Sequence, residues 1–354
     1  MNALQNALDA IDCHPTDELS RAKATALIRG YDHAWGDHDY IATSVEETIT
    51  GPIQNPETGR PARVFGMAGK VDVIAIKDGQ SVLIDHKTTS MDIEEPDATY
   101  WRQLAVESQV DHYMLLAWLN GRKIDNAVWD VIRKPGIKPK KLTKADMKAT
   151  LESGHYCGFS VTTGDRVEIE ATGRETYDMY SRRLEYDCTH ERPGRYFQRR
   201  SVPRMDAEIL EYANELWLHS KDILAEQKKN LPQRNSGACM NYGTPCPFLG
   251  VCSGHDSIAS DHWRRKECVH TELPDISGDG KDVLTNSRIR CFQTCRRKAY
   301  YKYDLGIERV DAEEPEALTF GTLIHVGLEA WWNTFLPGES NGNCNVPQEA
   351  ELAV

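Results

Sequence analysis

The stretch AGKVDVIAIKDGQSVLIDHKTTS, residues 68–90, decides the fold. Two β-rich runs flank Asp78-Gly79, a dipeptide that favours a two-residue hairpin turn. Such a turn fixes the register of both strands, so that Asp72 lies directly opposite Asp85 with Cβ atoms about 5 Å apart. Because side chains alternate along a strand, Lys87 shares the face of the two aspartates and His86 points to the other face.

Two directly opposed carboxylates destabilise a sheet unless a positive charge compensates them. Carboxylate oxygens are the ligands that Mg²⁺ and Mn²⁺ prefer, and a lysine beside such an ion can position water or stabilise charge on a phosphate. The alternative is a solvent-facing hairpin with ordinary charges. Ile74, Ile76 and Leu83 share the face of the aspartates, which argues against full exposure.

The composition is that of a folded protein, with 354 residues, 40% hydrophobic and 27% charged, and a net charge of −12. This charge disfavours a protein that coats nucleic acid non-specifically. Three runs, 131–148, 182–204 and 285–304, are nevertheless rich in Lys and Arg. Each run is either a solvated face or part of a polyanion footprint, and the second reading gains from interleaved aromatic residues. These are Tyr196, Phe197, Tyr300, Tyr301 and Tyr303.

Periodicity predicts strands over 40–87 and 126–133 and helices in several other ranges. No apolar run is long enough to cross a bilayer, and the start lacks the pattern of a secretory signal. Ten cysteines in such a chain indicate a reducing, cytoplasmic setting, in which grouped cysteines more often bind metal than form disulfides. The helices are expected within 1–35, 92–120, 140–153, 170–186, 205–228, 285–303 and 317–335.

The pattern of Asp72 followed by Asp85-His86-Lys87 resembles the motif of the PD-(D/E)XK nucleases. The rest resembles the RecB-like branch, which includes the AddB nuclease domain and the CRISPR-associated adaptation nucleases. The resemblance implies an α/β fold with a restriction-endonuclease-like core, a mixed central β-sheet flanked by helices. Gln109 and Tyr113, four residues apart and therefore on one helical face, look like the QxxxY motif. That motif is implied to bind DNA and to support the lysine.

The stretch FGTLIHVGLEAWW, residues 320–332, resembles the histidine helix of that branch. The resemblance makes His325 a metal ligand together with Asp72 and Asp85, with the backbone carbonyl of His86 as a further ligand. A lone histidine on an apolar helix is more often structural, so this assignment depends on the resemblance. Glu329, one turn later, is a candidate for orienting His325.

The stretch LTNSRIRCFQTCRRKAYYKY, residues 284–303, resembles the opening segment of the iron–sulfur members. It implies that Cys295 is one ligand of a [4Fe–4S] cluster in a small cysteine-rich subdomain. The other three ligands would come from CMNYGTPCPFLGVC, residues 239–252, as Cys239, Cys246 and Cys252. Zinc is the alternative, although its structural sites usually show tighter cysteine pairs, and Cys291 competes with Cys295.

The order of these segments differs from that of the branch, where the cysteine–histidine segment precedes the hairpin. The resemblance therefore implies a circular permutation in which 1–230 form the nuclease core, 231–275 the cysteine-rich segment and 276–284 a linker. Residues 285–354 would complete the same domain. Exchange of segments between two chains and a rearranged gene are the alternatives. We predict that His325 lies within coordination reach of Asp72 and Asp85 in a single folded copy.

Together these features predict a metal-dependent DNA nuclease, an exonuclease acting at DNA ends in recombination, repair or mobile-element processing. Lys87 would position the attacking water. No phosphate-binding Walker loop is present, so a separate helicase or recombination protein is the expected partner, and no membrane is expected. The alternative is a catalytically silent or partner-dependent DNA-binding accessory. The candidates for phosphate contact are Arg199, Arg200, Arg296 and Arg297.

Overall fold

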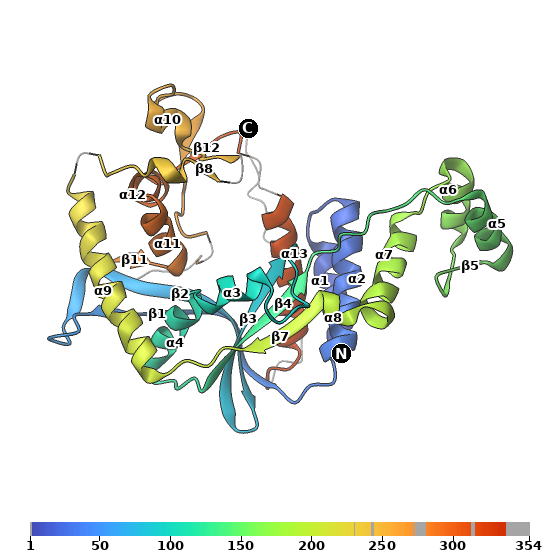
Figure 1. The fold of residues 1–354 in the computed structure, drawn as a ribbon, viewed down its shortest axis with the longest axis horizontal. Helices are drawn as coiled ribbons and strands as arrows, with labels where there is room; N and C mark the ends of the chain where they lie inside the picture. Colours follow the sequence, from blue (N-terminus) through green and yellow to red (C-terminus); the bar gives the residue numbers. More distant parts are fainter. Residues whose placement is uncertain are drawn as a thin grey trace, which may run out of the picture.

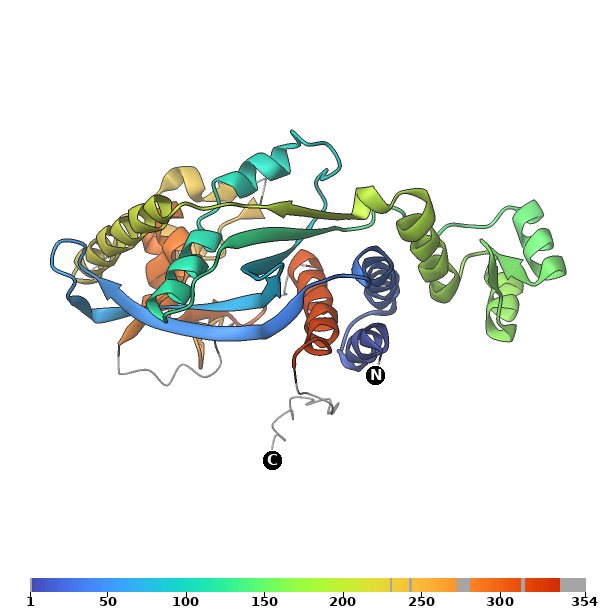
Figure 2. The ribbon, with the colours of Figure 1, turned by 90° about the horizontal axis from the view of Figure 1, so that it is seen from below.

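The computed structural model describes residues 2–229, 231–241, 244–271, 273, 281–312 and 316–337. Within them a six-stranded mixed sheet forms the core, with helices on both faces (Figures 1 and 2). Its strand order is β1-β2-β3-β4-β7, and β11 pairs with β2. The pairs β1–β2, β2–β3 and β4–β7 are antiparallel, whereas β3–β4 and β11–β2 are parallel. The strands are β1 (Ile41–Gln54), β2 (Pro61–Lys77), β3 (Gln80–Thr89), β4 (Asn126–Arg133), β7 (Phe197–Ser201) and β11 (Asp282–Leu284).

The hairpin of β2 and β3 has the predicted register. Val73 lies opposite Ile84, and Lys77 lies opposite Gln80. Asp78 and Gly79 have φ values of 50° and 75°, the left-handed conformation that this turn demands at both central positions. The register prediction is therefore confirmed.

Each face of the sheet carries its own hydrophobic cluster. One contains Ile74 and Leu83 and packs against α3 (Thr99–Ala105), α4 (Gln109–Leu119), α9 (Asp206–Gln227) and α11 (Asn286–Thr294). The other contains Val73 and Ile84 and packs against α1 (Ala3–Cys13), α2 (Glu18–Trp35) and α13 (Glu316–Asn333). Figure 2 shows the two layers on opposite sides of the strands.

The late segment of the chain is an integral part of this core. Helix α13 packs against α1 and α2, and Asn6 donates a hydrogen bond of 3.2 Å to the Thr334 hydroxyl. Trp331 Nε1 donates to Asp32 at 2.8 Å. Residues 282–284, assigned to a linker from the sequence, instead form β11. The remaining linker residues 276–280 and the tail 338–354 lie outside the described residues.

A small unit that projects from the predicted core was not foreseen. This unit, residues 138–176, is called the arm, and it extends away from the sheet beyond α7 (Tyr177–Tyr186) in both views (Figures 1 and 2). It has a separate apolar cluster of Leu142, Tyr156, Ile169 and Met179. A capping box at Thr143 starts its first helix later than predicted. Its elements are α5 (Lys144–Ser153), β5 (His155–Tyr156), β6 (Phe159–Ser160) and α6 (Thr163–Thr172).

A π-helical turn, Asp187–Glu191, and α8 (Pro193–Tyr196) lead from α7 back to β7. The cysteine-rich segment has little regular structure and a cluster of its own, formed by Phe248, Trp263, Tyr301 and Ile307. No helix in the described ranges combines the length and apolar character required to span a bilayer. The short elements of this region are Ser236–Ala238, β8 (Met240–Asn241), β9 (Thr244–Pro245), α10 (Leu249–Ser253), β10 (Trp263–Arg265), α12 (Arg296–Ala299), Tyr300–Asp304 and β12 (Ile307–Arg309).

Substituting Leu284→Ala tests whether β11 belongs to the core. Leu284 is fully buried, so we expect the free energy of unfolding to fall by about 2–5 kcal/mol in denaturant titrations. Leu218→Ala is the matched control, because Leu218 is 61% exposed on α9, and we expect a change within about 0.5 kcal/mol. Equally small changes in both variants would contradict the placement of β11.

Candidate active site

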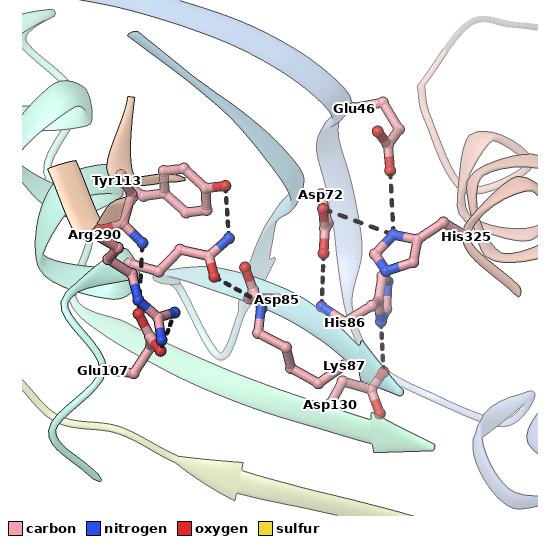
Figure 3. A network of polar contacts seen from close by, with 12 residues as sticks. Glu46, Asp72, Asp85, His86, Lys87, Glu107, Tyr113, Asp130, Arg290 and His325 are labelled. Atoms are coloured by element: carbon pink, nitrogen blue, oxygen red, sulfur yellow. Dashed lines mark hydrogen bonds and ion pairs between the residues drawn. The ribbon is translucent and has the colours of Figure 1, made fainter. Parts of the chain in front are cut away.

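A cleft of about 880 Å³ opens beside β2 and β3, between α4, α11 and α13. Figure 3 shows the polar side chains that converge there from these elements. Most of the residues predicted from the sequence to do chemistry line this cleft. The chemically relevant lining residues are Glu46, Asp72, Lys87, Gln109, Tyr113 and His325.

Three of these residues form a candidate cation site. One ligand atom each of Glu46, Asp72 and His325 lies within 4.8 Å of the other two, and no other trio of His, Cys, Asp or Glu in the described chain does so. His325 Nδ1 is 4.0 Å from Asp72 Oδ1 and 4.0 Å from Glu46 Oε1. Carboxylate oxygens with one imidazole suit a divalent cation. His325 thus reaches Asp72 within one chain, as predicted, but Asp85 is not part of this group.

Asp85 lies outside this group of three residues and is fully buried. Its Oδ2 is 2.5 Å from Lys87 Nζ. Burial raises the pKa of Asp85 to about 6, with the positive Lys87 lowering it and the negative Asp72 raising it further. The structure therefore holds a carboxylate whose charge is compensated only in part by the protein.

Glu46 was missed in the sequence. The register of β1 and β2 pairs Val45 with Val73 and Glu47 with Val71, which sets Glu46 across from Asp72. Glu46 has a φ of 50°, and its Oε2 lies 2.5 Å from Lys70 Nζ. The loop between these strands does not fix the register as the Asp78-Gly79 turn does, and β1 has a bulge, so no sequence signal identified Glu46.

Lys87 is held by a chain of hydrogen bonds from α4. Its Nζ donates to Gln109 Oε1 at 2.7 Å, and Gln109 Nε2 donates to the Tyr113 hydroxyl at 2.8 Å. Tyr113 packs so closely on β2 that a Cβ at Gly69 would lie 2.6 Å from its ring. Gln109 and Tyr113 therefore share one helical face and fix the position of the lysine.

His86 points to the opposite face of the sheet, as predicted. Its backbone N–H donates to Asp72 Oδ2 at 2.7 Å, and its Nδ1 is 3.2 Å from Asp130 Oδ2. The same Asp130 oxygen accepts hydrogen bonds from the Tyr31 hydroxyl at 2.6 Å and from Arg199 at 3.2 Å. Burial works against the charge of Asp130, but Arg199 and His86 hold its pKa well below the ordinary value. This network holds β3, the strand that carries Asp85 and Lys87, from the opposite face of the sheet.

Arg199, a predicted phosphate contact, lies outside the cleft. Its side chain is only 10% exposed, pairs with Asp130 and lies 4.4 Å over the Trp35 ring. It stabilises the core because its charge is needed to balance the buried Asp130.

The other three predicted arginines also lie outside the cleft and already have partners. Arg200 donates to the Pro96 carbonyl at 2.7 Å and stacks on a tryptophan, and Arg297 donates to the Pro232 carbonyl at 2.9 Å. Many other arginines of the runs 182–204 and 285–304 pair with nearby acids. The pairs are Arg182–Asp178, Arg183–Glu175, Arg192–Asp187, Arg204–Asp111, Arg288–Asp282, Arg290–Glu107 and Arg296–Glu226.

The four predicted cluster ligands come together from distant parts of the chain. Cys239, Cys246, Cys252 and Cys295 line one small pocket, and the competitor Cys291 does not. Asn235 N–H donates to Cys295 Sγ at 3.4 Å. No three of these thiols lie within 4.8 Å of one another, whereas one zinc with bonds of about 2.3 Å would hold them about 4 Å apart.

Comparison with known proteins agrees with this geometry. The model of the PD-(D/E)XK nuclease superfamily matches residues 4–253 and 283–353, and the chain belongs to that superfamily. Its members are usually nucleases that hydrolyse phosphodiester bonds and generally use Mg²⁺ or Mn²⁺. No curated protein matches the chain.

The raised pKa of Asp85 predicts a pH dependence of stability without metal. Between its ordinary value of 3.8 and about 6, the native state binds this proton more tightly than the unfolded state, so stability falls as pH rises through that window. Asp85→Asn removes this loss. We expect the variant to exceed wild type by an amount that grows across the window to on the order of 2–3 kcal/mol, measured by denaturation in EDTA.

The control for this measurement is Asp78→Asn, which removes one carboxylate from the turn of the same hairpin and keeps a residue suited to that turn. A stability difference between Asp85→Asn and wild type that stays constant with pH would contradict the assignment.

Proposed function

We propose that the protein is a metal-dependent DNA nuclease. The observation that carries the proposal is the convergence of Glu46, Asp72 and His325 in one chain, next to Asp85 and Lys87. Asp72, Asp85 and His325 would hold Mg²⁺ or Mn²⁺ with the carbonyl of His86, and Glu46 adds a ligand that the sequence did not indicate. The bound ion would supply Lewis acidity and an activated water for attack on the phosphodiester.

Lys87 orients that water and stabilises charge on the phosphate. Its ammonium group is held between Asp85 at 2.5 Å and Gln109 at 2.7 Å, so its direction is fixed before substrate binds. Tyr113 fixes Gln109 in turn, which makes both residues positioning groups. The His86–Asp130 contact holds the strand that carries the lysine, and thereby the N–H that binds Asp72.

The substrate proposed is a DNA end, and the setting is recombination, repair or mobile-element processing. The contact of the Gln109–Tyr113 pair with Lys87 supports placement in the RecB-like branch, whose members mostly act as exonucleases. A separate helicase or recombination protein would present the end. The packing of α13 and β11 within one copy supports a circularly permuted domain over segment exchange.

One contact favours a catalytically silent DNA-binding accessory as the second candidate. Lys70 Nζ lies 2.5 Å from Glu46 Oε2 and so already provides a positive charge at one of the three ligands. If that pair persists with metal present, the site loses a ligand. The same fold would then bind DNA without hydrolysis.

We also propose a [4Fe–4S] cluster on Cys239, Cys246, Cys252 and Cys295. Four cysteine side chains around one pocket support this ligation. Because Cys295 comes from the late segment and the other three from the segment before it, the cluster would join these parts covalently. Its role would be structural.

Nuclease activity is tested with Lys87→Ala on end-labelled single- and double-stranded DNA in Mn²⁺. We expect the hydrolysis rate to fall about 100-fold or more, because the fixed positive charge at the reacting phosphate is lost. Lys123→Ala is the control, since that side chain is 82% exposed, and it should keep full activity. Unchanged hydrolysis in Lys87→Ala would remove the catalytic assignment, and an inactive wild type would favour the accessory.

The cluster is tested by anaerobic purification of wild type and Cys246→Ser, followed by iron and zinc analysis and visible absorption. We expect iron with a broad visible band in wild type and loss of both in the variant. Cys291→Ser should retain them, because Cys291 does not line the pocket. One zinc per chain, without iron, would contradict the proposal.

A further inference from the structure

One basic run, residues 131–148, carries a group of exposed lysines that form no salt bridge with any described residue. Lys138, Lys140, Lys141 and Lys144 are all exposed. In the described part of the chain no carboxylate lies within 4.0 Å of their ammonium groups, whereas Lys148, in the same run, pairs with Glu152. The arginines of the runs 182–204 and 285–304 are largely neutralised, as described above. These four lysines therefore form an exposed positive surface at the base of the arm, without salt bridges to the described residues.

The backbone beneath these lysines is held in place. Arg183 donates to the Lys138 carbonyl at 3.0 Å. Glu175 accepts from the Lys140 N–H at 2.7 Å, and its own N–H donates to the Lys140 carbonyl at 3.1 Å. The four ammonium groups therefore form no salt bridge within the described ranges although their backbone is ordered, and the ammonium group of Lys140 lies 5.8 Å over the Tyr156 ring. A polyanion that binds them orders only side chains, which lowers the entropy cost of binding.

The lysine-bearing segment begins at the rim of the catalytic cleft. Lys134, directly after β4, donates its N–H to the Thr89 carbonyl at the end of β3, at 2.7 Å. Its Nζ lies 5.1 Å over the ring of Phe320 on α13, the helix that carries His325. Thr88, the residue before Thr89, lines the cleft. From there the chain runs outward to the arm (Figures 1 and 2).

We propose that Lys138, Lys140, Lys141 and Lys144 bind the phosphate backbone of the nucleic-acid strand whose reacting phosphate occupies the cleft. The inference rests on the proposed function and extends it to a substrate of minimum length. Residues 134–144 lead outward from the rim of the cleft over at most about 35 Å, so a strand that contacts these lysines continues beyond the cleft. The contacts are independent of sequence, since lysine ammonium groups meet phosphates as point charges.

The test is DNA binding by fluorescence anisotropy in EDTA, which measures affinity without hydrolysis. The variant changes the four lysines to Gln, which removes each positive charge and keeps a polar side chain. With a single strand of about 30 nucleotides, we expect the slope of log affinity against log salt to fall by up to about 3, because each lost phosphate contact contributes about 0.7. With a strand of about 6 nucleotides, which ends near the cleft, affinity and the Mn²⁺ cleavage rate should match wild type.

A charge-matched control separates local contact from net charge. It changes four exposed or partly exposed lysines outside the arm that already contact an acid or an aromatic ring, namely Lys77, Lys123, Lys221 and Lys229. The control should keep the wild-type salt slope, and both variants should keep the wild-type melting temperature.

An unchanged slope in the arm variant, or equal losses in the arm variant and the control, would overturn the inference. An acidic protein partner in place of DNA would give the first of these results. The two proposals fail separately. If wild type cleaves neither strand while the arm variant still loses its salt slope, the nuclease proposal fails and the arm remains a DNA-binding surface.

Discussion

The structure depends on one constraint, the direct opposition of Asp72 and Asp85 across a hairpin with a two-residue turn. Asp78 and Gly79 both adopt positive φ, and this turn leaves the two strands a single register. Two carboxylates are thereby forced together on the face of the cleft. A different group compensates the negative charge of each carboxylate. Asp72 accepts a hydrogen bond from the His86 N–H, and Asp85 forms an ion pair with Lys87.

Side chains from three other parts of the fold contact the residues of this hairpin. From α4, Gln109 and Tyr113 hold Lys87 toward the cleft. From behind the sheet, the buried network of Asp130, Arg199 and Tyr31 anchors His86 and with it the strand. From α13, His325 comes within 4.0 Å of Asp72. The late segment is therefore needed to complete the site.

What the sequence could predict depended on short-range rules. The Asp-Gly turn fixed the hairpin, and spacing of four residues placed Gln109 and Tyr113 on one face. Resemblance selected His325 and the four cysteines that line one pocket. Glu46 could not be found, because a loop of six residues and a bulge leave the register of β1 undetermined. The burial of Arg199 could not be predicted, because its partner Asp130 lies on another strand and no local pattern indicates that packing.

The central claim is that one divalent cation binds between the hairpin and α13 in a single copy of the chain. Pulsed electron paramagnetic resonance of bound Mn²⁺ tests it most directly, because a coordinating imidazole couples its nitrogen to the ion. The account predicts a nitrogen coupling in wild type that is absent in His325→Ala, and loss of tight Mn²⁺ binding in Asp72→Asn. A coupling that survives in His325→Ala, or Mn²⁺ bound equally tightly by Asp72→Asn, would contradict it.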